Sequence, residues 1–363
     1  MWNDTKIAKL LGVEYPIFQG PFGGNLSTVT LAAMVSNLGG IGGYGAYTNT
    51  PDEIVKVNTE LRKTTNKPYN INLWVSDNDV PAGSVTEEEL QRVKRLFQPY
   101  FEELGIPLPG KPLPFSSRFE NQVEVILDVR PPVFSFMFGT PSAAILEQCR
   151  RAGIVTVGAA TTLDEAVVLE SAGVDAIIAS GFEAGGHRPS FLAPAEQSLT
   201  GTFVLLQQIK EKVQTPVIAA GGIATGRGIA AALALGADAV QVGTAFLACE
   251  ESNAPAIHRE MLFGAESRYT VLTRAFTGRL GRGLRSRVSG EMRGKEGDFL
   301  PFPLQSQFLS PLRQAALAQK RWELILFWGG QIAPVLRHRK AADLMQALIS
   351  ETNDYFNQFG MQH

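Results

Sequence analysis

The sequence predicts an α/β fold: a (β/α)₈ TIM barrel with a smaller, mainly helical lid domain. Short apolar runs alternate with helical patterns at intervals of roughly twenty to forty residues, which is the spacing of βα units with buried parallel strands. Eight such runs can be counted, and a closed barrel needs about 250 of the 363 residues. Small residues follow most of the runs, whereas an open doubly wound sheet would normally concentrate glycines in one turn.

The predicted strands are short, continuous and apolar, as is typical of strands buried on both faces of a sheet. In chain order they occupy residues 17–19, 39–42, 70–75, 133–136, 154–157, 176–179, 216–219 and 239–242. Helical patterns follow the later strands at 141–152, 163–172, 203–212 and 225–235. Residues 1–75 and 132–250 are therefore predicted to form the barrel.

Two regions depart from this rhythm and are predicted to form the lid: residues 76–131 and 251–363. The first begins with a polar turn at 76–79 and a helical pattern at 86–104, which is ended by prolines at 107, 109, 112 and 114. In the second region the clearest helical pattern covers 317–327. Plain peripheral packing is the simpler explanation of both regions, and a lid beside the barrel is the one we favour.

The overall composition excludes several classes of function. A net charge of −2 predicts no general affinity for nucleic acid or for an anionic membrane. Two cysteines and four histidines argue against a disulfide scaffold and a dedicated zinc site. The N-terminal segment lacks the apolar core of a signal peptide, and no apolar stretch reaches the ~18 residues of a membrane span. We therefore expect a cytoplasmic protein without a bound metal or a membrane partner.

Glycine-rich turns follow the first, seventh and eighth predicted strands, at the end of the barrel where active sites lie. They contain Gln19, Gly20, Pro21, Gly221, Gly222, Gly243 and Thr244. Backbone N–H groups at the start of a helix point at an anion, and barrels commonly bind phosphate after strands seven and eight. These turns are candidates for a phosphate site, although glycines that serve only as turn residues would give the same pattern.

The turn after the sixth predicted strand, residues 180–188, is the most distinctive segment of the chain. It contains Ser180, Gly185 and Gly186 and places His187 at the catalytic end of a strand. An imidazole can act there as base, acid or hydrogen-bond donor near neutral pH. An ordinary loop histidine is the competing interpretation.

Amide side chains interrupt two of the apolar strands. Asn70 and Asn72 flank Ile71, and Gln241 lies in the last strand. A buried amide needs hydrogen-bond partners, so these positions call for a ligand or a polar neighbour.

Arginines are concentrated late in the chain. They are Arg268, Arg274, Arg279, Arg282, Arg285, Arg287 and Arg293. Aromatic residues suited to base stacking are not interleaved with them, so a solvated face or pairing with Asp and Glu of the barrel is favoured over nucleic-acid binding.

Several motifs together resemble one family, the nitronate monooxygenases, formerly called 2-nitropropane dioxygenases. The motifs are PIFQGPFGG at 16–24, EAGGHR at 183–188, GGIA at 221–224, QVGT at 241–244, TRAFTGR at 273–279, and the pair Gly330-Gln331. They occur in order from residue 16 to about 331, so the resemblance covers most of the chain. EAGGHR, GGIA and QVGT are specific as a set, although each alone is not.

The resemblance implies an FMN-bound barrel that oxidises alkyl nitronates with O₂ to a carbonyl compound and nitrite. It implies FMN contacts from Asn72, Gly185, Gly222, Gln241, Val242, Gly243 and Thr244, which join Gln19, Gly20, Pro21, Ser180, Gly186 and Gly221 in the predicted cofactor site. His187 matches the active-site histidine of the family. Ser180 stands where many members have Gln, and Pro189 and Ser190 stand where a Gly is usual. The expected partners are the nitronate, O₂ and a second subunit in a homodimer.

Three other functions compete with this prediction. A related FMN barrel that uses NAD(P)H, such as an enoyl reductase or a quinone reductase, shares the Gly-rich loops. A flavin-free barrel that binds a phosphorylated metabolite usually needs a catalytic Lys or carboxylate, and no Lys ends any of the eight apolar runs. A non-catalytic assembly subunit is the third alternative.

Overall fold

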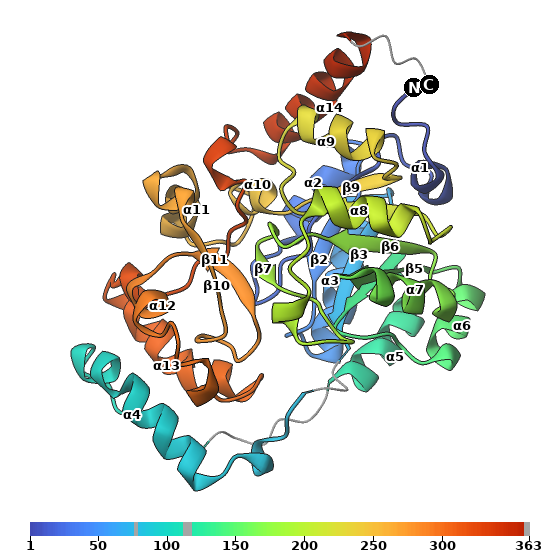
Figure 1. Cartoon of the computed structure of the whole chain (residues 1–363). Helices are drawn as coiled ribbons and strands as arrows, with labels where there is room; N and C mark the ends of the chain where they lie inside the picture. Colours follow the sequence, from blue (N-terminus) through green and yellow to red (C-terminus); the bar gives the residue numbers. More distant parts are fainter. Residues whose placement is uncertain (76–78, 112–117, 359–363) are drawn as a thin grey trace.

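The computed structural model describes residues 1–75, 79–111 and 118–358. Most of the predicted turn at 76–79 and the prolines at 112 and 114 therefore lie outside the described residues. Within these ranges, eight parallel strands form one sheet with the order β1-β9-β8-β6-β5-β4-β3-β2 (Figure 1). A parallel bridge between Phe18 and Ile41 joins the two ends of this order, so the sheet curls into the predicted barrel.

The strands of the barrel follow the predicted runs closely. They are β1 (Ile17–Gln19), β2 (Gly42–Gly45), β3 (Tyr69–Trp74), β4 (Val133–Met137), β5 (Val155–Ala160), β6 (Ala176–Ser180), β8 (Val217–Ala220) and β9 (Ala239–Val242). The second strand begins later than predicted, because Gly39 has a left-handed φ of +88° in the turn and pairing with β3 starts at Gly42. A side chain at Gly42 would collide with the backbone of Ala32, so glycine lets α2 lie directly on this strand.

Helices cover the outside of the barrel and form much of the lid. They are α1 (Lys6–Leu11), α2 (Val29–Asn37), α3 (Pro51–Thr64), α4 (Glu87–Glu103), α5 (Phe119–Val129), α6 (Ala143–Ala152), α7 (Leu163–Ala172), α8 (Thr202–Lys210), α9 (Gly226–Ala234), α10 (Thr244–Leu247), α11 (Ala256–Phe263), α12 (Arg287–Glu291), α13 (Leu304–Ala318) and α14 (Ala341–Gln358). Side-chain caps begin many of them. The Thr50–Glu53 and Thr86–Glu89 capping boxes start α3 and α4, for example.

The lid contains a small sheet that the helical prediction did not include. Strands β10 (Thr270–Thr273) and β11 (Gly281–Leu284) pair antiparallel, and β11 also pairs with β7 (Gly186–His187) from the barrel's sixth turn. The predicted helix at 317–327 is wrong for most of its length. Helix α13 ends at Ala318, Lys320 has a φ of +57°, and Phe327 accepts a hydrogen bond from Leu284 beside β11. A short 3₁₀ turn at Trp322–Leu324 follows, and only Phe327 and Trp328 pair with β11.

Two helices within the ranges predicted for the lid lie against the barrel. Helix α5 packs on α3 and β3, and α14 packs on α9 and α2 (Figure 1). The rest of the lid has its own apolar cluster, in which Phe97 of α4 contacts Phe308 of α13. How the chain divides into domains stays a prediction, and these contacts favour counting α5 and α14 with the barrel. None of the described helices is long and apolar enough to cross a membrane.

Candidate active site

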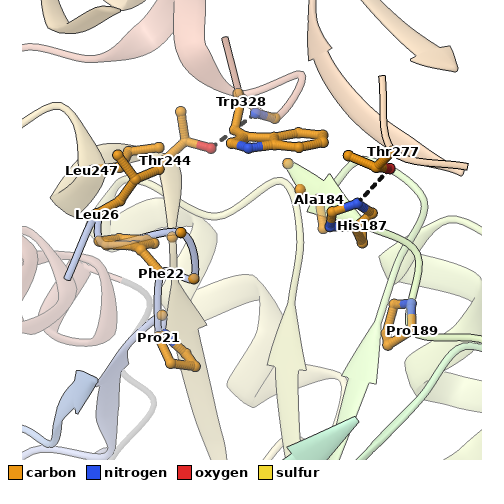
Figure 2. Close-up of a pocket in the computed structure, with 18 of the residues that line it drawn as sticks. Pro21, Phe22, Leu26, Ala184, His187, Pro189, Thr244, Leu247, Thr277 and Trp328 are labelled. Carbon is orange, nitrogen blue, oxygen red and sulfur yellow. Dashed lines mark hydrogen bonds between the residues drawn. The ribbon is translucent and has the colours of Figure 1, made fainter. Parts of the chain in front are cut away.

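A cavity of about 430 Å³ opens at the C-terminal ends of the barrel strands. The turns after β1, β6, β8 and β9 form its floor, and the lid segments around Thr277, α13 and Trp328 form its roof. In Figure 2 the indole of Trp328 lies between Thr244 on one side and His187 on the other. The cavity is therefore shared between barrel and lid.

Most of the predicted site residues line this cavity. They are Gly20, Pro21, Ser180, Gly185, Gly186, His187, Gly221, Gly222, Gln241, Gly243 and Thr244. The other three, Gln19, Asn72 and Val242, do not line it.

The three remaining residues form hydrogen bonds that connect neighbouring strands and turns beside the cavity. The amide of Gln19 accepts a hydrogen bond from the Gly43 N–H at 2.8 Å and donates to the carbonyl of Gly20. Asn72 donates to the hydroxyl of Ser135 at 2.9 Å. The carbonyl of Val242 accepts from the Gly20 N–H at 2.9 Å. Their position favours support of the strand ends over direct contact with a ligand.

The turns after β8 and β9 expose backbone to the cavity. Gly221 and Gly222 have φ values of +104° and +71°, which a side chain would strain. Gly243 has an ordinary φ of −99°, and a Cβ added there would meet no atom within 4 Å. The next helix, α9, is capped by Thr225, whose hydroxyl accepts from the Gly228 N–H. This geometry suits an anion held by backbone N–H groups.

Gln241 brings an unsatisfied polar atom to the cavity. Its Oε1 is buried and has no hydrogen-bond partner among the described residues. A buried acceptor without a donor is costly, at about 1–3 kcal/mol. Gln241 itself lines the cavity, so a ligand donor placed beside this amide would remove the penalty.

Two buried ionic groups fix the turn that carries His187. Arg188, only 2% exposed, donates to the carbonyls of Ser180, Gly181 and Ser198. The fully buried Glu165 accepts from the backbone N–H groups that follow at 191 and 192. Because both charges bind backbone groups, they hold the turn on each side of His187.

Aromatic rings surround the imidazole of His187. Its ring centroid lies 4.7 Å from Trp328, 5.2 Å from Trp74, 6.3 Å from Phe302 and 6.4 Å from Phe138. Burial among these rings and, to a lesser extent, the nearby positive charge of Arg279 together lower the pKa of His187 to about 3. His187 is therefore neutral at physiological pH.

A hydrogen bond to Thr277 fixes which nitrogen of the neutral imidazole carries the proton. His187 Nε2 lies 2.9 Å from the Thr277 hydroxyl, which itself donates to the carbonyl of Arg279 at 3.1 Å (Figure 2). A hydroxyl that donates to the carbonyl can only accept from the imidazole. When the hydroxyl donates to this carbonyl, Nε2 is the protonated nitrogen and Nδ1 keeps its lone pair.

Arg279 supplies a positive charge behind these rings. It forms an ion pair with Asp79 at 2.6 Å, and its guanidinium lies 4.0 Å from the ring centroid of Phe138 and 4.3 Å from that of Phe302. Burial lowers its pKa, and Asp79 opposes that shift. The predicted pairing of late arginines with acidic residues of the barrel is seen at Arg274, which pairs with Glu196, whereas Asp79 belongs to the first region predicted for the lid.

Sequence reasoning missed the aromatic wall and the role of Thr277. Trp74 ends β3, so its place at a strand end was a usable signal. Phe302 and Trp328 come from the lid, where no periodic pattern indicates which residues reach the barrel. No group of three or more metal-ligating side chains is found among the residues that the structure describes.

Comparisons with known proteins agree with these features. The family model for nitronate monooxygenase matches residues 4–351. A probable nitronate monooxygenase of Staphylococcus aureus is 38% identical over 358 residues, which cover 97% of this chain and 98% of that protein. The structure of a nitroalkane oxidase from Streptomyces ansochromogenes superposes with a TM-score of 0.87 at 34% identity, covering 97% of this chain and 99% of the other. FabK from Thermotoga maritima superposes with a TM-score of 0.75 at 30% identity, covering 98% of each chain.

Proposed function

The chain belongs to the nitronate monooxygenase family, and we propose that it uses FMN and O₂ to oxidise alkyl nitronates to a carbonyl compound and nitrite. One observation carries the proposal. A neutral histidine of fixed tautomer, the Gly-rich turns and the unsatisfied amide of Gln241 all face one cavity at the strand ends.

The residues at this site fit FMN. The flavin ring presents an N–H group, which would satisfy Oε1 of Gln241. The backbone at Gly222 and Gly243 would hold the phosphate with N–H groups and leaves room for its close approach. When bound, the flavin supplies the electron transfer between substrate and O₂.

His187 serves as an acceptor in this proposal. A nitronate is already deprotonated, so it needs no base and is oriented by the cavity wall. A neutral nitroalkane must first lose its α-proton, and Nδ1 of His187 can accept it because Nε2–H is bound to Thr277. We therefore expect nitronates to be oxidised faster than the corresponding nitroalkanes.

An FMN-dependent reductase that uses NAD(P)H is the second candidate. The likeness to FabK is consistent with it. A nicotinamide would stack on the flavin within the same cavity, so it needs no separate Gly-rich fingerprint.

The test is oxygen uptake by the purified protein with an alkyl nitronate, with nitrite and the carbonyl product measured together. The proposal expects uptake that depends on bound FMN and on the nitronate, and nitrite release in step with it. It is contradicted if a protein that contains FMN consumes no O₂ with a range of nitronates and releases no nitrite.

A further inference from the structure

A short segment of the lid, residues 328–331, crosses the open end of the barrel and is called the roof strap below. Most of it lines the cavity. Its first residue is held by the lid, because Trp328 forms an antiparallel bridge with Gly283 and its carbonyl lies 2.7 Å from His258 Nε2. Its last two residues bind the barrel instead, so the strap joins the two parts of the molecule.

The barrel end of the roof strap lies on the turns that carry the predicted cofactor site. The Gly330 N–H donates to the Thr244 hydroxyl at 2.9 Å, the dashed line at Thr244 in Figure 2. The Gln331 N–H donates to the carbonyl of Glu183 at 3.0 Å. A Cβ added at Gly330 would lie 2.9 Å from that carbonyl oxygen and 3.0 Å from the backbone nitrogen of Gly185. Glycine at this position therefore lets the strap lie directly on the turns after β6 and β9.

The two barrel contacts of the roof strap differ in how their acceptors are held. The turn at Glu183 is fixed by the protein, because its carboxylate accepts from the Thr202 N–H at 3.0 and 3.1 Å. The acceptor at Thr244 is a hydroxyl that faces the cavity, and no acceptor for its hydrogen is found among the described residues. A hydroxyl can accept and donate at once, and donating to an anion strengthens it as an acceptor. The Gly330 contact is therefore the one that responds to a ligand.

The position of the roof strap determines where Trp328 lies. The indole centroid is 4.7 Å from the imidazole centroid of His187. A Cβ added at Gly281, beside His187 in the small sheet, would lie 2.8 Å from the indole ring. Trp328 is thus packed closely over the turn that carries His187, and a strap that left the barrel would open this part of the roof.

We propose that Thr244 is a positioning residue that couples cofactor binding to closure of the roof. Its hydroxyl accepts from the Gly330 N–H and donates to the phosphate of a bound FMN, so the strap is held against the barrel and Trp328 over His187. Because such coupling is reciprocal, a closed strap also strengthens FMN binding. This inference rests on the FMN site of the proposed function and is independent of the substrate that the site oxidises.

The experiment compares amide hydrogen exchange at single residues in the flavin-free protein and in the same protein saturated with FMN. Exchange of the Gly330 N–H is expected to be about ten-fold or more slower with FMN. The Leu284 N–H, which donates to the carbonyl of Phe327 within the lid, should change by less than about two-fold and is the internal control. Thr244→Val removes the FMN-dependent protection at Gly330, whereas Thr244→Ser keeps the hydroxyl and retains it.

A matched pair of glycine variants gives the same test without changing Thr244, and it decides the matter if Thr244→Val no longer binds FMN. Gly330→Ala places a methyl group against the backbone of the barrel turns, whereas the methyl group of Gly329→Ala meets only the side chains of Leu262 and Leu284. With saturating FMN, the amide at position 330 should exchange about ten-fold or more faster in Gly330→Ala than in wild type. The rate in Gly329→Ala should stay within about two-fold of wild type.

Three results overturn the inference. They are equal exchange of the Gly330 N–H with and without FMN, FMN-dependent protection that persists in Thr244→Val or Gly330→Ala, and an FMN effect of the same size at Leu284, which would mean that the whole lid responds. Failure of the proposed reaction is distinguishable from these results. If FMN protects Gly330 through Thr244 but no nitronate is oxidised, the coupling stands and the reaction fails, and a protein that binds no FMN contradicts both.

Discussion

His187 is the residue on which the chemistry of the site depends most. Its position at a strand end was predictable from the sequence, because the Gly-rich turn around it is distinctive. Its protonation was not predictable, since this depends on rings contributed by β3, the turn after β4 and the lid. Only the folded structure brings these residues together.

We expect His187→Asn to retain FMN and to lower turnover with nitroalkanes by about 10²-fold or more. The loss with preformed nitronates should be smaller, because they need no proton removal. Flavin absorbance and oxygen uptake measure the two effects. Because the pKa of His187 is lowered to about 3, it stays neutral above that pH, and its ionisation should not appear in the activity profile between pH 5 and 8. If wild-type activity changes with pH around pH 6.5, and this change is absent in His187→Asn, the imidazole is not held neutral.

Thr277 acts through His187 and is a positioning residue. Thr277→Val removes the acceptor for Nε2–H, so we expect kcat for nitroalkanes to fall about ten-fold and the pH profile to shift as the imidazole loses its fixed tautomer. Thr277→Ser keeps the hydroxyl and should restore most of the rate. If the valine and serine variants have the same kcat and the same pH profile, the hydrogen bond has no role in positioning.

The βα turns were the most predictable elements of this protein. Apolar runs ending in glycine predicted the strands and the side of the barrel that carries the site. The exact bounds of a strand were harder to predict, as β2 shows. A glycine-rich segment has few side chains whose alternation would indicate where the strand begins. The helix predicted at 317–327 failed because an apolar run alone does not separate a helix from an extended segment buried beside β11.

The turn after β9 allows a test of the phosphate site that is free of backbone strain. Gly243→Asp places a carboxylate in open space at an ordinary φ, so we expect repulsion of the phosphate and loss of FMN. Gly243→Asn has nearly the same shape without the charge and should retain more FMN. Flavin content after gel filtration measures both. If both variants contain equal, stoichiometric amounts of flavin, the turn after β9 does not bind the phosphate.

At the scale of the whole molecule, the site forms where barrel and lid meet. His258 of α11 is 2% exposed and lies against the carbonyl of Trp328 at 2.7 Å, so this contact supports the roof of the cavity. Composition and strand spacing predicted a barrel with an additional lid. They did not show which lid residues face the barrel, because those contacts are distant in sequence and follow no periodic pattern.

The stability of this arrangement should depend on pH. Burial lowers the pKa of His258 to about 4, below its unfolded value of about 6.5, so the unfolded chain binds more protons between these values. The free energy of unfolding should therefore fall as the pH drops from about 6.5 towards 4. Urea unfolding at pH 7 and pH 5 measures this loss, which should be smaller in His258→Gln than in wild type. His338→Gln leaves the buried imidazoles in place and serves as the control. An unchanged loss in His258→Gln would exclude His258 as its source.

The central claim is that the cavity between barrel and lid uses FMN to oxidise a nitronate. Anaerobic mixing of the FMN-loaded protein with substrate, followed by flavin absorbance, tests it most directly. We predict rapid bleaching by an alkyl nitronate, little bleaching by NADH or NADPH, and return of the oxidised spectrum with nitrite in solution when O₂ is admitted. Rapid bleaching by NADPH with none by any nitronate would contradict the claim and identify the protein as a reductase.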